Sequence, residues 1–252
     1  MIIVRAVWLS SIGGGGKAFQ VVSTEITAFD RLLGGGFPEG SVIALMGEPG
    51  SGFDLFAQQV MFFKARRAGE KVVYFSVDRP CGDVRVEMAT YGWNLEELEK
   101  KGVWSFVDMC TYRRDVRRGM TPRRALAELL TSRLPKAIEE GSHIVVDTFS
   151  YFLLFYELKD IIEIFELTLL SAHEHGGVHF LLVVPGLHDS KTLTTVAHFA
   201  DGVLEFNLHP ESEEAAGVIK VRKLRKVHHA LRLIPYRITD EGIVVETTMR
   251  VA

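Results

Sequence analysis

The chain has 252 residues, of which 47% are hydrophobic and 24% charged, and its net charge is −3. This mixture is typical of a globular protein and fits one large α/β domain. The slightly acidic balance gives no basic field that would favour nucleic acid, and no apolar run approaches the ~18 residues of a membrane span. The two cysteines, Cys81 and Cys110, form no metal-binding spacing, so we expect a reduced, cytoplasmic location.

The N-terminal segment, residues 1–20, differs from the rest of the chain. Its apolar start is too short, and too interrupted by Arg5, for a signal peptide. The run from Gly13 to Gly16 predicts a flexible hinge. We therefore expect an N-terminal arm with a glycine hinge at 1–20 and a single domain at 21–252. The arm is either a strand that docks on this or a neighbouring subunit, or a loose segment, and the sequence leaves both open.

The pattern of apolar residues predicts alternating helices and strands along the chain. Ser23 or Thr24 is expected to cap a short first helix, with Glu25 in its first turn, and three glycines from Gly34 end it. Further strands are predicted at 41–46, 71–76, 103–107, 143–146, 178–184, 201–206, 218–225, 231–236 and 243–247. Further helices are predicted at 53–69, 83–91, 94–101, 121–140, 161–174 and 193–199. The alternation implies an α/β fold, with a mostly parallel sheet covered on both faces and antiparallel strands at one edge.

The stretch between the predicted strand at 41–46 and the helix that follows it has the layout of a phosphate-binding P-loop. Glycines let the backbone wrap so that its N–H groups point at a phosphate on the helix N-terminus. A P-loop also needs a lysine and a hydroxyl residue after its last glycine, and this chain has Phe53 and Asp54 there. We expect the Asp54 carboxylate to take the place of the anion, where the helix dipole favours it by about 0.3–1 kcal/mol. The alternative is an unrelated strand–turn–helix with a capping aspartate. The residues of this loop are Gly47, Glu48, Pro49, Gly50, Ser51, Gly52, Phe53 and Asp54.

Several further segments occur in an order that is typical of one family. They are LGGGFPEG at 33–40, YFSVDR at 74–79, IVVD at 144–147, ADGV at 200–203, KLR at 223–225 and PYRI at 235–238. From residue 24 to 245 the chain resembles the KaiC-like branch of the RecA superfamily of P-loop ATPases, with a degenerate Walker A motif. The resemblance implies a RecA-like three-layer fold and an archaeal origin.

The resemblance also implies roles for single residues. Asp147 stands where the family holds Mg²⁺ through water, and Asp78 stands where the first of two glutamates activates the attacking water. Arg79 replaces the second glutamate and reverses its charge. Lys223 and Arg225 match a pair that reaches the nucleotide of the neighbouring subunit, so they are candidates for a subunit interface. From the residues alone, Asp147 equally fits a local capping acid, and the two basic residues equally fit an exposed strand.

These substitutions predict a loss of catalysis. Phosphoryl transfer depends on positioning and charge stabilisation, and one lost electrostatic contact typically costs about 10²–10³ in rate. We therefore expect a pseudo-ATPase without a cofactor, because ATP and Mg²⁺ would require a substitute lysine such as Lys17 or Lys64. The protein would act as a homo-oligomer or by binding a protein or peptide partner, with Phe53 making the rim of the cleft more apolar. The rival hypothesis is an unusual ATP-binding protein or ATPase of the same fold.

The segment at 113–124 is the candidate for nucleic-acid binding, as in a recombinase-like DNA-binding accessory protein. Its basic side chains would supply salt-dependent contacts to phosphates. Only Tyr112 offers aromatic stacking nearby, and Asp115 interrupts the run, so a solvated loop and helix face is the favoured interpretation. The candidate residues are Arg113, Arg114, Arg117 and Arg118.

The histidines predict no metal site. On a helix, His173 and His175 point to different faces, because residues two apart do not meet. His179 follows after two glycines that break the helix, and His228 and His229 are adjacent and cannot chelate easily from a strand.

Overall fold

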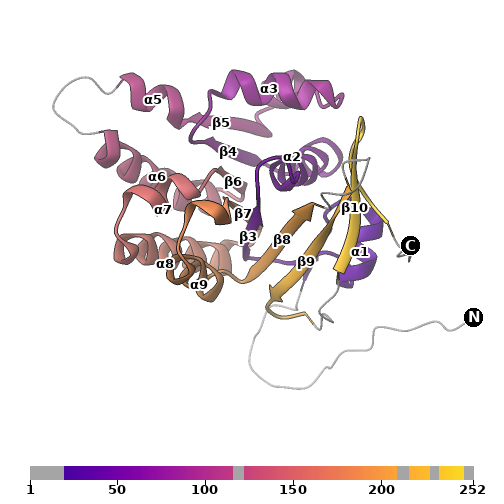
Figure 1. Cartoon of the computed structure of the whole chain (residues 1–252). Coiled ribbons are helices and arrows are strands. Elements are labelled where there is room, and N and C mark those ends of the chain that lie inside the picture. The colour runs from indigo at the N-terminus through magenta and orange to yellow at the C-terminus, as the bar shows by residue number, and fades with distance from the viewer. Residues whose placement is uncertain (1–19, 116–121, 209–215, 228–232, 247–252) are drawn as a thin grey trace, which may run out of the picture.

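The computed structural model describes residues 20–115, 122–208, 216–227 and 233–246 (Figure 1). Its strands are β1 (Val21–Val22), β2 (Phe37–Pro38), β3 (Ser41–Gly47), β4 (Val72–Ser76), β5 (Trp104–Asp108), β6 (His143–Asp147), β7 (Val178–Val183), β8 (Gly202–Leu208), β9 (Ala216–Leu224), β10 (Leu233–Thr239) and β11 (Gly242–Val245). Its α-helices are α1 (Thr27–Leu33), α2 (Phe53–Phe63), α3 (Cys81–Thr90), α4 (Glu96–Lys100), α5 (Met109–Asp115), α6 (Pro122–Glu139), α7 (Ser150–Phe155), α8 (Leu158–His175) and α9 (Ser190–Phe199). A π-helical turn η1 (Lys64–Ala68) extends α2, and a 3₁₀ turn η2 (Pro185–Leu187) follows β7. The predicted N-terminal arm lies outside the described residues, apart from residue 20.

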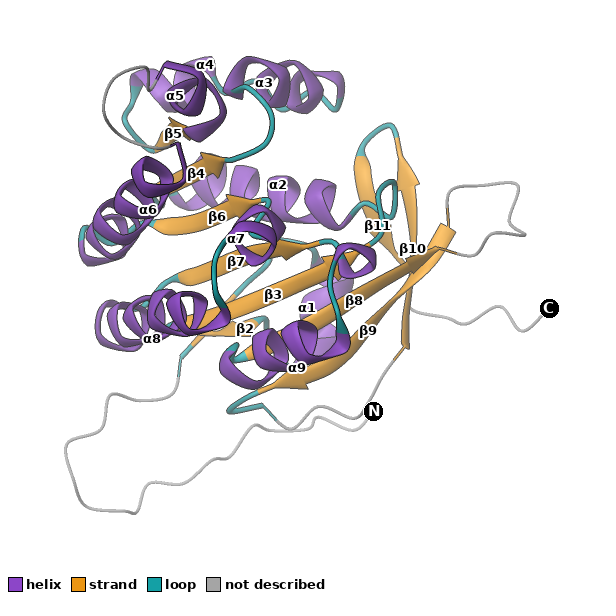
Figure 2. Ribbon diagram, turned by 60° about the vertical axis from the view of Figure 1, so that its left-hand side comes forward, coloured by secondary structure: helices purple, strands orange, loops and turns teal. Residues whose placement is uncertain are grey.

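The central sheet has nine strands in the order β11-β10-β9-β8-β3-β7-β6-β4-β5 (Figure 2). The strands from β8 to β5 in this order are parallel, whereas β9, β10 and β11 are antiparallel at one edge. The short strands β1 and β2 pair separately. This topology confirms the predicted α/β fold. Because the inner strands are parallel, the loops that follow their carboxyl ends lie along one edge of the sheet, where such folds place their sites.

Helices cover both faces of the sheet, and each face has its own core. Ile43 and Leu45 of β3 pack with α1 and α2 on one side. Val42, Ala44 and Met46 pack with α6 and α8 on the other side. All seven residues of β3 are buried, which explains why this strand is apolar without alternation. Burying each large apolar side chain stabilises the fold by about 1.5–3 kcal/mol.

The first helix begins later than the sequence predicts. We expected Ser23 or Thr24 to cap it, but α1 begins at Thr27, and Glu25 has a left-handed φ of 65° outside the helix. The hydroxyls of Ser23 and Thr24 instead donate hydrogen bonds to the Asp30 carboxylate, each at 2.7 Å. They therefore fix the helix through one of its side chains rather than through its first backbone N–H groups.

Two short helices, α5 and α7, are not predicted from the sequence. They have seven and six residues, which is too short for a clear apolar period. α5 begins directly after the carboxyl end of β5, and α7 begins two residues after that of β6. Among the helices of the described residues, none is long and apolar enough to cross a membrane.

Candidate functional site

The predicted loop joins β3 to α2 as a tight turn at the carboxyl edge of the sheet. Gly50 and Gly52 adopt left-handed φ angles of 85° and 77°, which glycine takes without strain. Gly47 is required for a different reason, because a Cβ there would lie 2.3 Å from the Ser51 hydroxyl oxygen. The glycines thus shape a closely wrapped turn between a strand and a helix, as the sequence predicts.

Phe53 and Asp54 occupy the first turn of α2. Phe53 is only 5% exposed, and its ring lies so close to Gly47 that a Cβ on Gly47 would be 2.9 Å from it. The ring therefore folds back onto the loop, and Phe53 also borders the cleft beside it, where the sequence predicts it. Oδ1 of Asp54 accepts a hydrogen bond from the Leu55 N–H at 2.9 Å. The carboxylate therefore takes up an N–H group that a bound anion would use.

Arg79 stands at the centre of the cleft beside this loop. Its Nη2 donates to Oδ2 of Asp147 at 3.0 Å and lies 3.9 Å from Oδ2 of Asp54. Its Nη1 donates to the carboxylate of Glu87 on α3. Oδ2 of Asp147 also accepts a hydrogen bond from the buried Tyr74 hydroxyl at 2.5 Å. One guanidinium thus joins carboxylates that come from α2, α3 and β6.

Two neighbouring strands position this cluster. β4 and β6 run parallel with Ser76 beside Asp147. The chain turns directly after β4, where the Ser76 hydroxyl donates to the Arg79 carbonyl at 2.6 Å. This hydrogen bond fixes the turn that carries Asp78 and Arg79, so that both residues lie next to the end of β6.

The carboxyl groups of the cleft outnumber its cation. Burial raises the pKa of Asp54 and Asp78, and the charge of Asp147 raises both further. Burial also raises the pKa of Glu87, although Arg79 opposes the shift. For Arg79 itself, burial acts to lower the pKa, but the charges of Asp147 and Glu87, together with Tyr74 and the hydrogen bond to Asp147, outweigh it and the pKa is raised. One permanently charged guanidinium therefore faces four carboxyl groups.

A cavity of about 290 Å³ opens beside the cluster. It brings together the loop, the turn after β4 and the end of β6, which the sequence places far apart. Its lining residues are Pro49, Gly50, Phe53, Asp54, Asp78, Arg79, Asp147, Thr148 and Val184. The predicted loop and both predicted strand-end acids thus share one cavity.

Two residues of the loop face away from this cavity. Oε1 of Glu48 accepts a hydrogen bond from the Gly186 N–H at 3.1 Å, and Glu48 lines a smaller cavity of about 180 Å³ together with Glu205. Ser51 is buried, and its carbonyl accepts a hydrogen bond from the Tyr236 hydroxyl at 2.5 Å. The antiparallel strand β10 therefore braces the back of the loop.

Lys223 and Arg225 lie at the opposite edge of the sheet, near the start of β8. Arg225 is 47% exposed and pairs with Asp201 at 3.4 Å. Burial lowers the pKa of Lys223. Its ammonium donates at 2.9, 2.7 and 2.6 Å to three carbonyls at the end of α9, those of Ala197, His198 and Ala200. Within one chain Lys223 therefore acts as a helix cap, while Arg225 keeps a large exposed surface.

Of the two lysines that could replace the missing one, Lys64 does not reach the loop. Lys64 forms an ion pair with Glu70 at 2.9 Å at the far end of α2. A helix rises about 1.5 Å per residue, so the 11 residues of α2 separate Lys64 from the loop by roughly 16 Å. Lys17 lies outside the described residues. Among the described residues that line the cleft, the cation is Arg79.

The arginine candidates for nucleic-acid binding begin on α5. The Arg113 guanidinium stacks over the Tyr151 ring of α7, 4.7 Å from its centroid. The side chain of Arg114, and Arg117 and Arg118 as a whole, lie outside the described residues.

The histidines have partners of their own. His173 bonds Asp201 at 3.0 Å, and His179 bonds the Gly176 carbonyl at 2.9 Å. His175 bonds the Ser171 carbonyl at 3.1 Å. In the described part of the chain, no three His, Cys, Asp or Glu side chains are placed to hold a metal ion. His228 and His229 lie outside that part.

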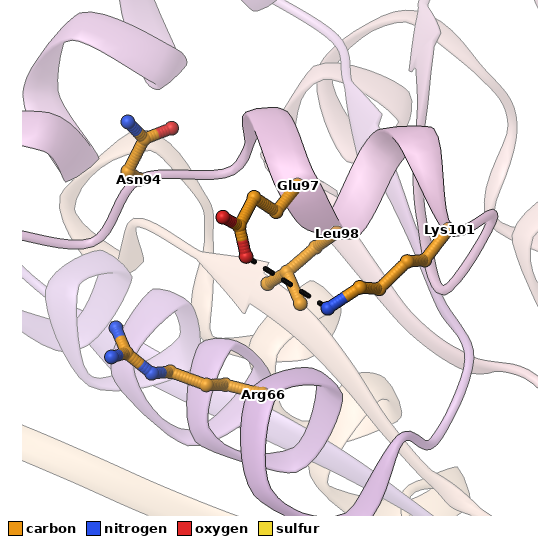
Figure 3. Close-up of a pocket in the computed structure, with 5 residues that line it drawn as sticks. All are labelled: Arg66, Asn94, Glu97, Leu98 and Lys101. Atoms are coloured by element: carbon orange, nitrogen blue, oxygen red, sulfur yellow. Dashed lines mark ion pairs between the residues drawn. The ribbon is translucent and has the colours of Figure 1, made fainter.

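A separate crevice of about 400 Å³ lies between η1 and α4 (Figure 3). Its lining residues are Arg66, Asn94, Glu97, Leu98 and Lys101. Figure 3 shows Glu97 and Lys101 directed toward each other, and their charged atoms are 3.8 Å apart. None of the cleft residues lines this crevice, so it is not part of the candidate site.

Sequence reasoning missed two residues of the cleft, Glu87 and Tyr74. Glu87 looks like any acid on a solvated helix, because only the turn after β4 brings α3 against Arg79. Tyr74 lies within an apolar strand and looks like a core residue. The charge reversal at Arg79 is the one signal that could have prompted a search for further acidic partners.

Comparison with known proteins agrees with this geometry. The sequence pattern of the family described as the KaiC ATPase matches residues 22–250. The chain belongs to the KaiC ATPase family. Among its relatives, an UPF0273 protein of Thermotoga maritima is 27% identical over 241 residues, covering 89% of this chain and 95% of that protein. An UPF0273 protein of the archaeon Pyrococcus horikoshii is 28% identical and covers 89% of this chain and 93% of its own length.

Two further matches extend the comparison to a clock protein and to a solved structure. The circadian clock protein KaiC3 of Synechocystis is 26% identical over 90% of this chain, which corresponds to 45% of that larger protein. The crystal structure of a KaiC-like protein from Pyrococcus horikoshii superposes with a TM-score of 0.70 at 26% identity, covering 90% of this chain and 99% of that one. The KaiC-like fold of this chain is thus established over nearly its whole length.

Proposed function

We propose that this KaiC-family protein is a pseudo-ATPase that acts through self-assembly or by binding a protein or peptide partner. The observation that carries the proposal is the position of Arg79. Its guanidinium donates to Asp147 at 3.0 Å, and Asp147 is the residue that the family resemblance assigns to Mg²⁺. A cation of the protein itself therefore contacts the carboxylate that a metal would need.

The residues of the cleft do not fit Mg·ATP. Oδ2 of Asp147 accepts hydrogen bonds from both Tyr74 and Arg79. The loop ends in Phe53 and Asp54, so it lacks the lysine that compensates phosphate charge and the hydroxyl that binds the metal. The residues that would bind the metal and those that would bind the phosphates are both altered, which supports a loss of ATP turnover.

The charge of the cleft gives a second support. Four carboxyl groups face one guanidinium, and ionised carboxylates repel a polyphosphate. The same excess favours a basic group, since a lysine or arginine side chain would restore the charge balance. Arg225 of a second copy is the candidate within this sequence, because it is 47% exposed and lies at the edge of the sheet opposite the cleft.

One observation favours the rival function, which is ATP binding without turnover. Arg79 lines the cavity beside Pro49 and Gly50 of the loop. If the guanidinium left Asp147, its N–H groups could contact a phosphate in place of the missing lysine. A binding experiment separates the two functions.

The experiment is a thermal-shift titration with Mg·ATP and Mg·ADP. We expect no shift for the wild type and a saturable shift for a variant that combines Phe53→Lys, Asp54→Thr and Arg79→Glu. A ligand at 100 times its Kd adds about 2.7 kcal/mol of stability, which is readily detected. Arg85→Glu on α3 is the matched control, because Arg85 pairs with Glu99 outside the cleft. A Mg²⁺-dependent shift in the wild type that Arg79→Met abolishes would instead establish the rival function.

Self-assembly is tested by sedimentation velocity over a range of concentrations. Arg225→Glu should weaken association if Arg225 enters the acidic cleft of a neighbour. Arg222→Glu is the matched control, since Arg222 is similarly exposed near the end of β9, just before Arg225, and pairs with Glu205. Equal association of the two variants would exclude Arg225 from the interface.

A further inference from the structure

We propose that the cleft and the adjoining face of α7 receive the protein's own N-terminal segment, residues 2–9, with the Arg5 guanidinium among the carboxyl groups of the cleft. This occupant rests on the proposed function, in which the cleft takes a basic side chain instead of Mg·ATP. A partner's basic group would then have to displace Arg5 before entering the cleft.

Helix α7 lies at the carboxyl ends of β6 and β7 (Figure 2) and exposes apolar side chains there. Residues 148–156 contain no charged side chain, yet Leu154 is 48% and Phe155 41% exposed. Leu187 of the nearby turn η2 is 51% exposed. Exposed apolar side chains that gather in one place mark binding surfaces, so this face of α7 favours an apolar segment.

Hydrogen bonds hold this apolar face against the wall of the cleft. The Ser150 hydroxyl oxygen accepts the N–H of Val184, which lines the cleft, at 2.8 Å. Nε2 of His188 lies 2.8 Å from the same oxygen, which brings Leu187 beside the start of α7. Leu154 lies one helical turn after Ser150, on the same side of α7. The apolar face therefore continues the surface of the cleft.

The carboxyl groups of the cleft favour a cation beside this apolar face. Asp78 lines the cavity, is exposed, and forms no ion pair among the described residues. Oδ2 of Asp54 lies 3.9 Å from Nη2 of Arg79, which is too far for a hydrogen bond. A second guanidinium would therefore meet two carboxyl groups that Arg79 does not bond.

The N-terminal segment has the complementary composition. Within residues 2–9, Arg5 is the only charged side chain and the others are all apolar. The first acidic residue of the chain is Glu25, so the segment carries no charge that the cleft would repel. An arginine inside an apolar run thus matches carboxyl groups beside an apolar helix face.

The other segments outside the described residues match less well. Arg117 and Arg118 lie in the short link between α5 and α6, without an apolar run on both sides. Arg232 directly precedes β10 and Arg250 follows β11, and the strand directions place the start of β10 and the end of β11 at the amino edge, away from the cleft. Residues 209–215 are acidic.

The N-terminal segment is long enough to reach the cleft of its own copy. The Gln20 carbonyl accepts the N–H of Glu39 at 3.0 Å, just before β3 begins, so the described chain starts at the amino edge. The seven residues of β3 separate the two edges by roughly 23 Å. About 15 residues separate Arg5 from Gln20, and they span roughly 50 Å when extended. Because both parts belong to one chain, a high effective concentration favours docking within one copy.

Trp8 reports the docking through acrylamide quenching of its fluorescence in the full-length protein. Trp93 and Trp104 are 4% and 1% exposed, and a Trp8→Phe variant gives their signal for subtraction. In the wild type, Trp8 should be quenched several-fold less than in a synthetic peptide of residues 1–12. The protection should be the same at all protein concentrations.

Charge reversal tests the contact of Arg5 with the cleft. Arg5→Glu should lower the ratio of docked to undocked segment at least about tenfold, because a carboxylate then faces carboxylates. Lys17→Glu is the matched control, since it makes the same charge change in the same arm outside residues 2–9, and it should leave Trp8 protected. Adding Asp78→Lys to Arg5→Glu should restore the protection.

The apolar contact is tested on α7. Leu154→Ser should increase the quenching of Trp8, because it removes an apolar side chain from the docking face. Leu170→Ser on α8 is the matched control, since Leu170 is 67% exposed on another helix, and it should not change the quenching.

Three outcomes would overturn the inference. If Trp8 of the wild type is quenched like the peptide, the segment does not dock, and the nucleotide titration still decides the pseudo-ATPase assignment because its variants lie outside the segment. If the protection is lost on dilution, the segment docks on a second copy. If Arg5→Glu and Leu154→Ser both leave Trp8 protected, the segment lies elsewhere on the molecule.

Discussion

The two ends of α2 border polar clusters that differ in charge balance. The cleft cluster, at the N-terminal end of the helix, consists of Asp54, Arg79, Glu87 and Asp147. The amino-edge cluster, at the other end, consists of Lys64, Glu70, His143 and His179. In the amino-edge cluster, Oε2 of Glu70 lies 2.9 Å from Lys64 and 2.6 Å from His143. Both clusters use the same helix and the ends of β6, yet only one of them borders the cavity at the carboxyl edge.

The amino-edge cluster is balanced in charge. The Val178 N–H donates to Nδ1 of His143 at 2.9 Å, so the imidazole proton lies on Nε2, where Glu70 accepts it. One ammonium and one carboxylate then cancel beside a neutral imidazole. The hydrogen bond from His143 lowers the pKa of Glu70 to about 2, against its burial, and Lys64 adds to the shift.

The opposite pKa shifts show what each cluster does. A carboxyl group with a lowered pKa stabilises the fold at neutral pH, whereas one with a raised pKa costs stability there. The pKa of Glu70 is lowered, while the pKa values of Asp54 and Glu87 are raised. The amino-edge cluster therefore stabilises the fold. The cleft cluster has an excess of carboxyl groups, which a basic group of a partner could neutralise.

The largest effect should come from Glu70→Gln. This change leaves the Lys64 ammonium, whose side chain is 4% exposed, without its counter-charge. Breaking a buried pair costs about 3–5 kcal/mol, and because Glu70 is 39% exposed we expect the lower end, about 3 kcal/mol in urea denaturation. Adding Lys64→Met should recover most of the loss. A loss below about 1 kcal/mol would mean that the pair behaves like a surface ion pair.

Acidification should destabilise the protein through His179, which is the next largest effect. Burial lowers its pKa from 6.5 to about 3, so the unfolded chain takes up a proton below pH 6.5 while the folded chain does not. Stability is therefore retained above pH 6.5 and lost as the pH falls toward 3, by up to about 1.4 kcal/mol per pH unit. His179→Gln should flatten this slope, and the exposed His175→Gln should not. Identical slopes for the two variants would refute the assignment.

Arg79→Met should lower the free energy of unfolding by about 1–3 kcal/mol. The effect is intermediate because Arg79 is partly exposed, whereas the carboxylate that loses its cation is nearly buried. The Asp147 side chain is 9% exposed and would lose its cation. Since the pKa values of Asp54 and Glu87 are raised, the folded state binds protons more readily than the unfolded state, and acidification should restore part of the stability.

The control for Arg79 is Arg79→Met with Asp147→Asn, which should be more stable than Arg79→Met alone. Both variants are compared by urea denaturation at pH 7 and pH 5. If acidification destabilises Arg79→Met more than the wild type, the result would contradict an excess of ionised carboxylates in the cleft.

The fold could be predicted from the sequence because its signals are local. The apolar run of β3 and the left-handed glycines after it need no tertiary information, and the matched strand ends follow in a fixed order. The predicted cap of α1 was wrong because the Ser23 and Thr24 hydroxyls bond to Asp30, seven and six residues away, which no local rule gives. Helix α7 could not be predicted because its six residues are fewer than two helical turns.

The cleft could be predicted only in part. The strand ends place Asp78 and Asp147 at one edge, and the loop follows from its glycines. The partners of Arg79 could not be predicted, because Glu87 lies on a helix whose position depends on the turn before it. The sequence predicts Phe53 beside the cleft, where it lies, but it does not predict that the ring packs into the space left by the missing side chain of Gly47.

The smallest effect should come from Asp54→Asn. The change removes a carboxylate that the helix N-terminus favours by about 0.3–1 kcal/mol, but it also removes repulsion from Asp147 and the cost of burying a charge, which raise the Asp54 pKa. These terms oppose each other, and the amide oxygen can still accept the Leu55 N–H, so we expect stability within about 1 kcal/mol of the wild type in urea. A loss above about 2 kcal/mol would mean that Asp54 is tightly paired with Arg79, and the cleft cluster would then be as balanced as the amino-edge cluster.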